Sequence, residues 1–270
     1  MSEFTPGKAT ICIVNYKTLD FTRLCLRSIR KFTTYPCDVV VVDNHSDDES
    51  LDYLRGLDWI TLLERDTSGD DSGGRSHARA LDLALEACTT EFFISMHSDT
   101  FVLREGWLSD LISHFDSPNV AGVGSGKIEL TPRWREWVKM LTDYRTMKRK
   151  LLRTPDPLGK HRYYNRTICS LYRTEILKSE GMTFELGRDE GITAGKKMHF
   201  DLEDGGYDMV HIPEREMGKS IIHLAHATQV INPAEFSLRN KTTRKINGLI
   251  KKVMSMGPVQ DVLHDDSLDQ

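Results

Sequence analysis

The sequence of 270 residues lacks three features that would each assign it to a class of protein. No window approaches the run of about 20 apolar residues that a membrane-spanning helix requires. Neither sign of charge is in large excess, and the formal net charge of -4 gives no global reason to expect a nucleic acid partner. The first residues contain no basic segment followed by an apolar one, so they predict no signal peptide and a cytoplasmic protein.

A disulfide framework is also absent. The sequence has five cysteines, an odd number, and their spacing is not that of a small cross-linked domain. Cys12, Cys25 and Cys88 lie inside apolar periodic segments rather than at turns. These residues are therefore predicted to be buried free thiols in a reducing compartment.

The first half of the sequence alternates strand and helix patterns. The segment "ATICIVNY" (residues 9–16) is rich in β-branched residues, and residues 18–32 carry apolar side chains at helical spacing. "CDVVVVDN" (37–44) is apolar on both faces, as expected of a central parallel strand covered by helices. Further strands are predicted within 59–65, 92–96 and 119–125, with helices between them. The fold class is therefore α/β, a single domain with a Rossmann-like, mostly parallel sheet flanked by helices.

The second half is less regular. A basic helix is predicted over residues 133–153, a strand entering a helix within 166–177, and a helix ending near Gly205 followed by a strand within 191–213. In residues 237–256, Ile246, Leu249, Ile250 and Val253 lie near one helical face with basic residues flanking it. This pattern fits either peripheral membrane contact or an amphipathic helix packed on its own domain.

Polar residues follow three of the predicted strands at their carboxyl ends, where open α/β sheets bind ligands. These residues are Asn15 and Tyr16, then Asp43, then the triplet His97-Ser98-Asp99. A nucleotide diphosphate leaving group needs its charge neutralised, and a divalent ion held by oxygen ligands such as Asp99 can do this. Imidazole is tolerated better by manganese than by magnesium.

Four segments in this order, "IVNYKT", "VVVVDNHSDD", "GGRSHARALDLAL" and "FFISMHSDTFV", resemble the nucleotide-binding half of family-2-like glycosyltransferases with the GT-A fold. The resemblance implies that Tyr16 packs on the nucleobase and that Asp43 hydrogen-bonds it. It also implies that Asp99 holds Mn²⁺ or Mg²⁺ against the diphosphate. Further contacts to the nucleotide are implied for Asn15, Arg75, Arg79, Asp82, His97 and Ser98.

"CSLYRTEIL", the segment 184–213 and "IIHLAHAT" resemble the acceptor half of such enzymes. The acceptor hydroxyl must lose a proton to a base, and Asp189 and Glu190 are the candidates, with Asp189 preferred. Alternatively, this acidic pair is a solvated helix start. His223 is a candidate second metal ligand. The resemblance implies a donor half (10–125), an acceptor half (126–235) and a C-terminal helical tail (236–270).

The resemblance therefore implies a metal-dependent, inverting transfer of a sugar from a nucleotide diphosphate donor, with a UDP-sugar favoured, to a hydroxyl of a glycan or lipid-linked acceptor. His97 departs from the acidic residue usual at its position, and it either ligates the ion or contacts the donor. This departure favours one alternative, a non-catalytic sugar-nucleotide or glycan-binding module. Another alternative is a nucleotidyltransferase on a related fold, although the expected glycine-rich basic loop after the first strand is missing.

Overall fold

The computed structural model describes residues 4–70, 72–126, 128, 163–236 and 238–270. Its main sheet has seven strands in the order β3-β2-β1-β4-β7-β6-β8. They are β1 (Thr5–Asn15), β2 (Cys37–Asp43), β3 (Thr61–Glu64), β4 (Thr90–His97), β6 (Val120–Ser125), β7 (Cys169–Arg173) and β8 (Asp208–Ile212). Strand β7 is antiparallel to β4 and β6, and the remaining pairs are parallel. The predicted mostly parallel sheet is confirmed.

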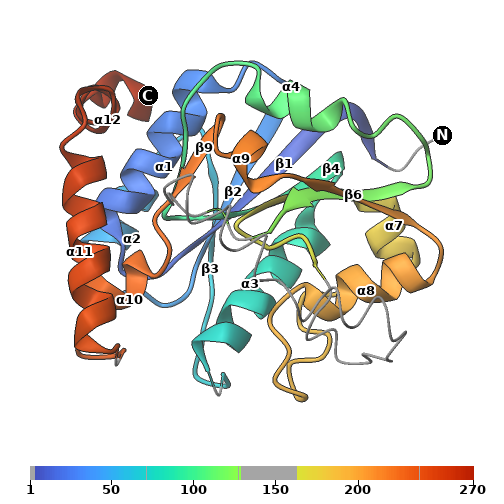
Figure 1. Ribbon diagram of the computed structural model, residues 1–270. Coiled ribbons are helices and arrows are strands. Elements are labelled where there is room, and N and C mark those ends of the chain that lie inside the picture. Colours follow the sequence, from blue (N-terminus) through green and yellow to red (C-terminus); the bar gives the residue numbers. More distant parts are fainter. Residues whose placement is uncertain (1–3, 71, 127, 129–162, 237) are drawn as a thin grey trace, which may run out of the picture.

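Helices cover both faces of this sheet (Figure 1). Along β1, Ile11 and Ile13 point into one apolar core, whereas Cys12 and Val14 point into the other. The first core is covered by α1 (Leu19–Phe32), α2 (Glu49–Arg55), α4 (Trp107–Ile112), α11 (Asn240–Met254) and α12 (Gly257–Leu263). The second is covered by α3 (Gly73–Ala87), α7 (Thr174–Ser179) and α8 (Lys196–Asp204). Burial on both sides explains why the central strands are apolar throughout.

The elements predicted in the second half are present where the chain is described. Residues 166–177 contain β7 followed directly by α7, and α8 ends at Asp204, next to Gly205, before β8. The basic helix predicted over residues 133–153 lies outside the described residues. Cys12, Cys25 and Cys88 are buried free thiols, as predicted.

A second, two-stranded sheet joins distant parts of the sequence. It consists of β5 (Thr100–Val102), directly after β4, and β9 (Ile221–His223), which follows the short helix α9 (Glu214–Met217) and precedes α10 (Ala227–Ile231). The strands are antiparallel, and Thr100 lies opposite His223. This pairing places the carboxyl end of β4 beside residues of the second half.

The C-terminal helices are part of the core. Ile246 and Val253 of α11 are buried, and Val253 belongs to the first apolar core. The buried guanidinium of Arg27 in α1 holds the chain end, because it donates to the Leu263 carbonyl and to the carboxylates of Asp266 (2.6 Å) and Asp269 (2.9 Å). The apolar face of α11 therefore packs on its own domain. Among the described residues, no helix combines the length and hydropathy needed to cross a bilayer.

Candidate active site

A pocket of about 860 Å³ lies at the carboxyl ends of β1 and β4. Its walls come from Tyr16, the start of α3, and several segments between residues 164 and 236. This is the end of the sheet at which the polar residues of the sequence predicted a ligand site. First-half and second-half residues face one another across it.

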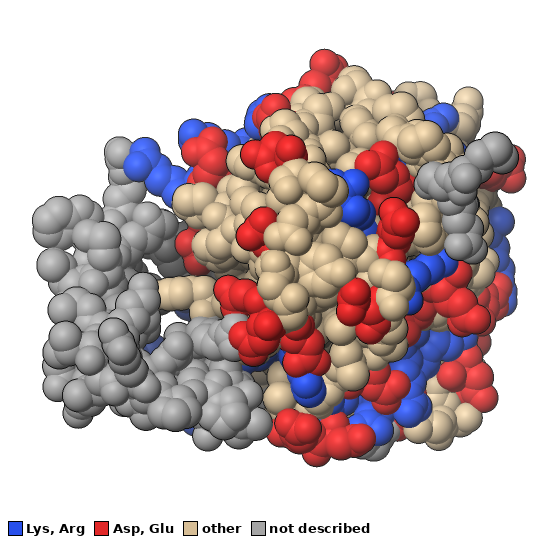
Figure 2. Space-filling model, turned by 90° about the vertical axis from the view of Figure 1, so that its right-hand side faces the viewer, with Lys and Arg blue, Asp and Glu red and all other residues tan. Residues whose placement is uncertain are grey.

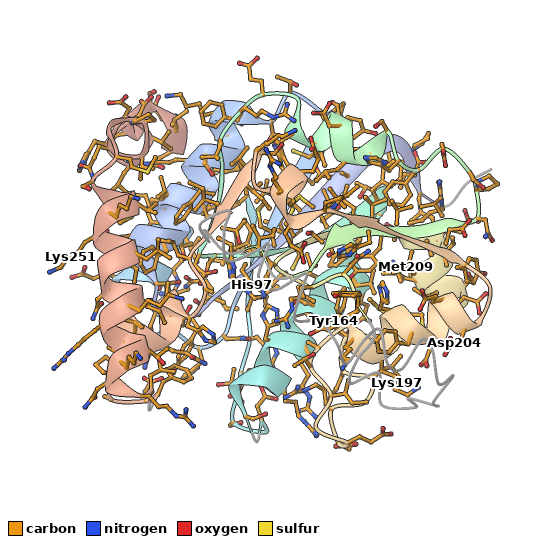
Figure 3. The ribbon with its side chains drawn as sticks, in the orientation of Figure 1. His97, Tyr164, Lys197, Asp204, Met209 and Lys251 are labelled. Carbon is orange, nitrogen blue, oxygen red and sulfur yellow. The ribbon has the colours of Figure 1, made fainter. Side chains whose placement is uncertain are left out.

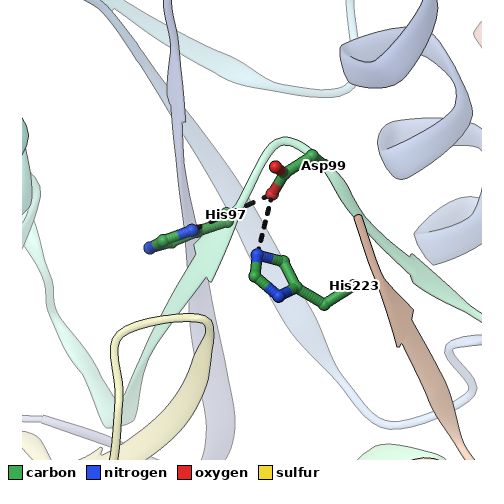
Figure 4. Close-up of side chains that lie close together, drawn as sticks. All are labelled: His97, Asp99 and His223. Atoms are coloured by element: carbon green, nitrogen blue, oxygen red, sulfur yellow. Dashed lines mark ion pairs between the residues drawn. The ribbon is translucent and has the colours of Figure 1, made fainter. Parts of the chain in front are cut away.

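His97, Asp99 and His223 meet in this pocket (Figure 4). His97 ends β4 and Asp99 follows in the turn to β5, while the β5–β9 pairing brings His223 alongside. The Asp99 Oδ1 atom lies 3.2 Å from His223 Nε2 and 3.8 Å from His97 Nδ1. Ser98, from the same triplet, also lines the pocket, and its hydroxyl lies 3.4 Å from that of Thr18.

The Asp99 carboxylate is buried without full compensation. Asp99 is 5% exposed, and its Oδ1 atom accepts no hydrogen bond of acceptable geometry from any described residue. His223 Nδ1 is likewise buried without a partner in the described chain. Burial raises the pKa of Asp99, but the interactions with His223 and His97 outweigh it and hold that pKa below its ordinary value. An ionised carboxylate with an unpaired buried oxygen is costly in a protein interior, and a bound cation would compensate it.

His97 is oriented by a residue of the second half. Its Nε2 lies 3.2 Å from the Thr167 hydroxyl oxygen. A proton on Nε2, donated to Thr167, leaves a lone pair on Nδ1, the nitrogen that faces Asp99. Burial, reinforced by His77, lowers the pKa of His97 to about 3, so the ring is neutral at physiological pH. A neutral imidazole is the form that coordinates a metal.

Tyr16 lies on the pocket wall, where it contacts Glu235 and Phe236 from the second half of the chain. Its hydroxyl donates to Glu235, which also accepts from Lys17 Nζ at 2.6 Å. Burial and the hydrogen bond to Glu235 raise the pKa of Tyr16. The Phe236 ring stands edge-on to the Tyr16 ring, with centroids 6.4 Å apart. Sequence reasoning missed Glu235 and Phe236, which no local motif connects to Tyr16.

Asn15 and Asp43 lie beneath the pocket and do not line it. The Asn15 side-chain amide donates to Asp43 Oδ1 at 2.7 Å. Asp43 also accepts from the backbone N–H of Ser46 at 2.9 Å and from the Ser46 hydroxyl at 2.5 Å. Both residues are almost completely buried. The two predicted nucleotide contacts are thus joined to each other, in a network that shapes the ends of β1 and β2.

Arg79 and Asp82 connect α3 to the second half. Arg79 forms ion pairs with Asp70 (2.8 Å) and Glu185 (3.1 Å). Asp82 accepts the backbone N–H groups of Phe184 (2.6 Å) and Glu185 (3.1 Å), and burial raises its pKa to about 6. Neither side chain lines the pocket. Their contacts anchor the segment that leads to the predicted catalytic acids.

Asp189 and Glu190 lie on the exposed loop after that segment. The Asp189 side chain is 91% exposed and pairs with Arg75, near the start of α3. Neither acid lines the pocket, whereas their neighbour Arg188 does. Of these three consecutive loop residues, only Arg188 therefore lines the pocket, and the two acids lie outside its lining.

A family model for glycosyl transferase family 2 matches residues 10–179. The chain belongs to glycosyl transferase family 2. No curated protein matches this family-2 glycosyltransferase in sequence.

Solved structures share the GT-A fold of this family-2 glycosyltransferase at low sequence identity. A mannosyltransferase from Pyrobaculum calidifontis, PcManGT, solved with GDP-Man and Mn²⁺, is 15% identical with a TM-score of 0.53, and the match covers 97% of this chain and 84% of that one. Residues 1–349 of TarS from S. aureus are 14% identical with a TM-score of 0.52, over 88% of this chain and 69% of that one. These matches support the predicted fold.

Three basic residues of the glycosyltransferase pocket were missed by sequence reasoning. The His77 ring packs against that of His97, with centroids 4.9 Å apart, and burial lowers the pKa of His77 to about 4. Arg166 and Arg188 also line the pocket, and neither forms an ion pair within the described part of the chain. His77 could have been found from the sequence, because it lies in the segment "GGRSHAR", which also contains the predicted nucleotide contact Arg75. Arg166 and Arg188 have no such local signal, since tertiary structure brings them to the pocket.

Proposed function

We propose that this protein transfers a sugar from a nucleoside diphosphate sugar to an acceptor hydroxyl in the pocket beyond β1 and β4. The observation that carries the proposal is the buried Asp99 carboxylate, which has an oxygen without a hydrogen bond from the described residues and two imidazoles beside it in a pocket of about 860 Å³. The family and the GT-A fold support the same reaction class. We assign residues 10–125 mainly to the donor, residues 126–235 mainly to the acceptor, and residues 236–270 to the tail.

The residues of the pocket suit a divalent cation. Asp99 and His223 would hold it through a carboxylate oxygen and an imidazole nitrogen. The feature that fits this role is Asp99 Oδ1, which lies 3.2 Å from His223 Nε2 and accepts no hydrogen bond from the described residues. The bound ion would act as a Lewis acid for the diphosphate, which supplies several kcal/mol of stabilisation in such reactions. Because two of the three candidate side chains are imidazoles, the donor set favours Mn²⁺ over Mg²⁺.

Basic side chains of the pocket complement a diphosphate. Arg166 and Arg188 line it without acidic partners in the described chain, and guanidinium groups bind phosphate oxygens in a bidentate manner. A side chain at Gly74 would collide with the Arg188 guanidinium, so the glycine allows Arg188 to lie against the start of α3. We assign Tyr16, with Phe236 edge-on to it, to the nucleobase, because an aromatic ring on the pocket wall suits stacking.

The transfer itself would be a single in-line displacement with inversion. The acceptor oxygen forms a bond to the anomeric carbon as the bond from that carbon to the phosphate oxygen breaks, and the electron pair leaves with the nucleoside diphosphate. The acceptor proton passes to a carboxylate, for which we propose Asp189. Its neighbour in sequence, Arg188, lines the pocket, which supports this role, and a positioned base contributes about 10²- to 10⁴-fold.

The purified protein should be incubated with a panel of UDP- and GDP-sugars, with and without Mn²⁺, and the phosphate products identified by mass spectrometry. We expect Mn²⁺-dependent release of a nucleoside diphosphate from one donor. Pyrophosphate release would instead establish a nucleotidyltransferase. Donor binding without turnover, with every acceptor class supplied, would establish a sugar-nucleotide-binding module.

A further inference from the structure

The charged side chains on the outward face of α11 are all basic. Its exposed charged side chains are Lys241, Arg244, Lys245, Lys251 and Lys252. At 3.6 residues per turn these five side chains fall within an arc of about 120°, which we call the basic face. The buried Ile246 and Val253 lie on the opposite side. The helix contains no acidic residue, and Figure 3 shows Lys251 projecting away from the molecule at its edge.

This arrangement differs from the rest of the surface. None of the five cations, nor Arg239 just before the helix, takes part in an ion pair anywhere in the described ranges. Several exposed cations elsewhere pair with acids, as in Arg55–Glu64 and Lys219–Glu216. The exposed cations that lack such a partner in the described ranges, such as Lys31 and Arg215, are not gathered on one helical face. The face shown in Figure 2 carries acidic and basic side chains intermixed. An unpaired basic stripe on a chain of net charge -4 is therefore a local feature.

We infer that the basic face of α11 binds the surface of a bilayer that contains anionic lipids. Each Lys or Arg close to such a surface strengthens binding about fivefold, so five on one face suffice for reversible attachment. Met256, two residues after the helix, and Ile231 of α10 are each 41% exposed and offer apolar side chains for contact with a bilayer. A nucleic acid is also polyanionic, but binding of single strands uses aromatic side chains for stacking, and residues 238–256 contain none.

The mode of attachment is electrostatic and leaves the helix on its domain. The apolar side of α11 is already buried, so the helix cannot insert that side into a membrane without leaving its core. Glu235 and Phe236 line the pocket, and α11 begins at Asn240. Four residues span at most about 14 Å. Attachment through the basic face would therefore hold the pocket close to the lipid surface.

Co-sedimentation of the full chain with vesicles tests the inference. We expect binding to an equal mixture of phosphatidylcholine and phosphatidylglycerol, little binding to phosphatidylcholine alone, and release as salt is raised. The variant Lys245→Gln/Lys252→Gln should bind the anionic vesicles about 25-fold more weakly. The matched control Lys8→Gln/Lys219→Gln removes the same charge from other elements and should bind within about twofold of wild type.

Thermal unfolding of both double variants confirms that each is folded. Equal binding to neutral and anionic vesicles would overturn the inference, as would equal losses in the two double variants. Binding to a single-stranded RNA but not to anionic vesicles would replace the lipid by a nucleic acid. Release of nucleoside diphosphate from a soluble donor should be unchanged in Lys245→Gln/Lys252→Gln, so a failed membrane test and a failed transferase test remain distinguishable.

Discussion

Two groups of buried polar side chains lie at neighbouring strand ends, and they differ in whether their hydrogen bonds are complete. At the ends of β1 and β2, the Asn15 amide donates to Asp43, Ser50 and Ser46, and its carbonyl accepts from the hydroxyls of Thr22 (2.7 Å) and Thr18 (3.1 Å).

At the end of β4, by contrast, Asp99 Oδ1 and His223 Nδ1 are buried without a hydrogen-bond partner among the residues described. Buried polar groups are nearly always paired, so a complete network indicates a structural role and an incomplete one indicates a missing ligand. The comparison therefore predicts that the first group stabilises the strand ends and that the second group holds a ligand.

The largest effect is expected for Asp99→Asn. The change keeps the shape but removes the charge that would hold the cation, so turnover should fall about 10³-fold, or about 4 kcal/mol. The free energy of unfolding should fall less than in Asp43→Asn, because the change removes the ion pair with His223 but no hydrogen bond to Oδ1 within the described residues. Product release measures turnover, and urea unfolding measures the free energy of unfolding.

Asp43→Asn is the matched control. It should lose stability while Mn²⁺ affinity is kept. Similar stability losses in both variants would remove the distinction between the two groups of buried side chains.

Asn15→Ala should lower the free energy of unfolding by about 3 kcal/mol, because several buried partners lose their hydrogen bonds at once. Urea denaturation measures the loss. Asn44→Ala is the control, since Asn44 is also buried (4% exposed) but forms no side-chain hydrogen bond within the described chain. Its cost should stay below about 1 kcal/mol. Equal costs would show that the Asn15 network is not what stabilises these strand ends.

Asp189→Asn tests an acid that belongs to neither buried group. If Asp189 is the base, turnover should fall about 10²-fold, with donor affinity and stability unchanged because the side chain is exposed. Single-turnover kinetics and donor titration separate chemistry from binding. Glu190→Gln, one residue away, should retain nearly full turnover. A loss only in Glu190→Gln would transfer the role to Glu190.

The smallest effect concerns Asp82, whose pKa is raised to about 6 by burial, against about 3.9 in an unfolded chain. The folded state therefore binds the proton more tightly, so the contribution of Asp82 to stability is complete below about pH 4 and is lost as pH rises through 6. Relative to Asp82→Asn, wild type should gain about 1 to 2 kcal/mol between pH 7 and pH 4, after allowance for partial exposure. A difference that does not change with pH would mean that the carboxylate is well solvated.

The two halves of the chain differ in how much could be predicted. In the first half, local periodicity identified the strands and helices, because each βαβ unit buries both faces of its strand. The same reasoning predicted that Asn15, Tyr16, Asp43 and Asp99 meet at one end of the sheet. It did not predict that Asp43 points toward Asn15 and Ser46, since strand spacing fixes the position of a residue but not the partner of its side chain.

For α11, sequence reasoning left two roles open for the apolar side, and packing on the domain is the one observed. An amphipathic pattern specifies that one face is buried but not what buries it. The membrane contact that we propose therefore uses the other face of the same helix.

The sequence by itself determined the α/β fold, the end of the sheet that carries the pocket, and the Asp99 candidate, because hydrophobic period and strand-end polarity are local properties. The His223 candidate came with the family resemblance. Only the tertiary structure decided which polar groups satisfy one another and which remain unpaired. The β5–β9 pairing sets His223 against Asp99, and Arg166, Arg188 and Phe236 enter the pocket from distant segments. Such contacts depend on how the chain closes over long sequence separations, which no local pattern encodes.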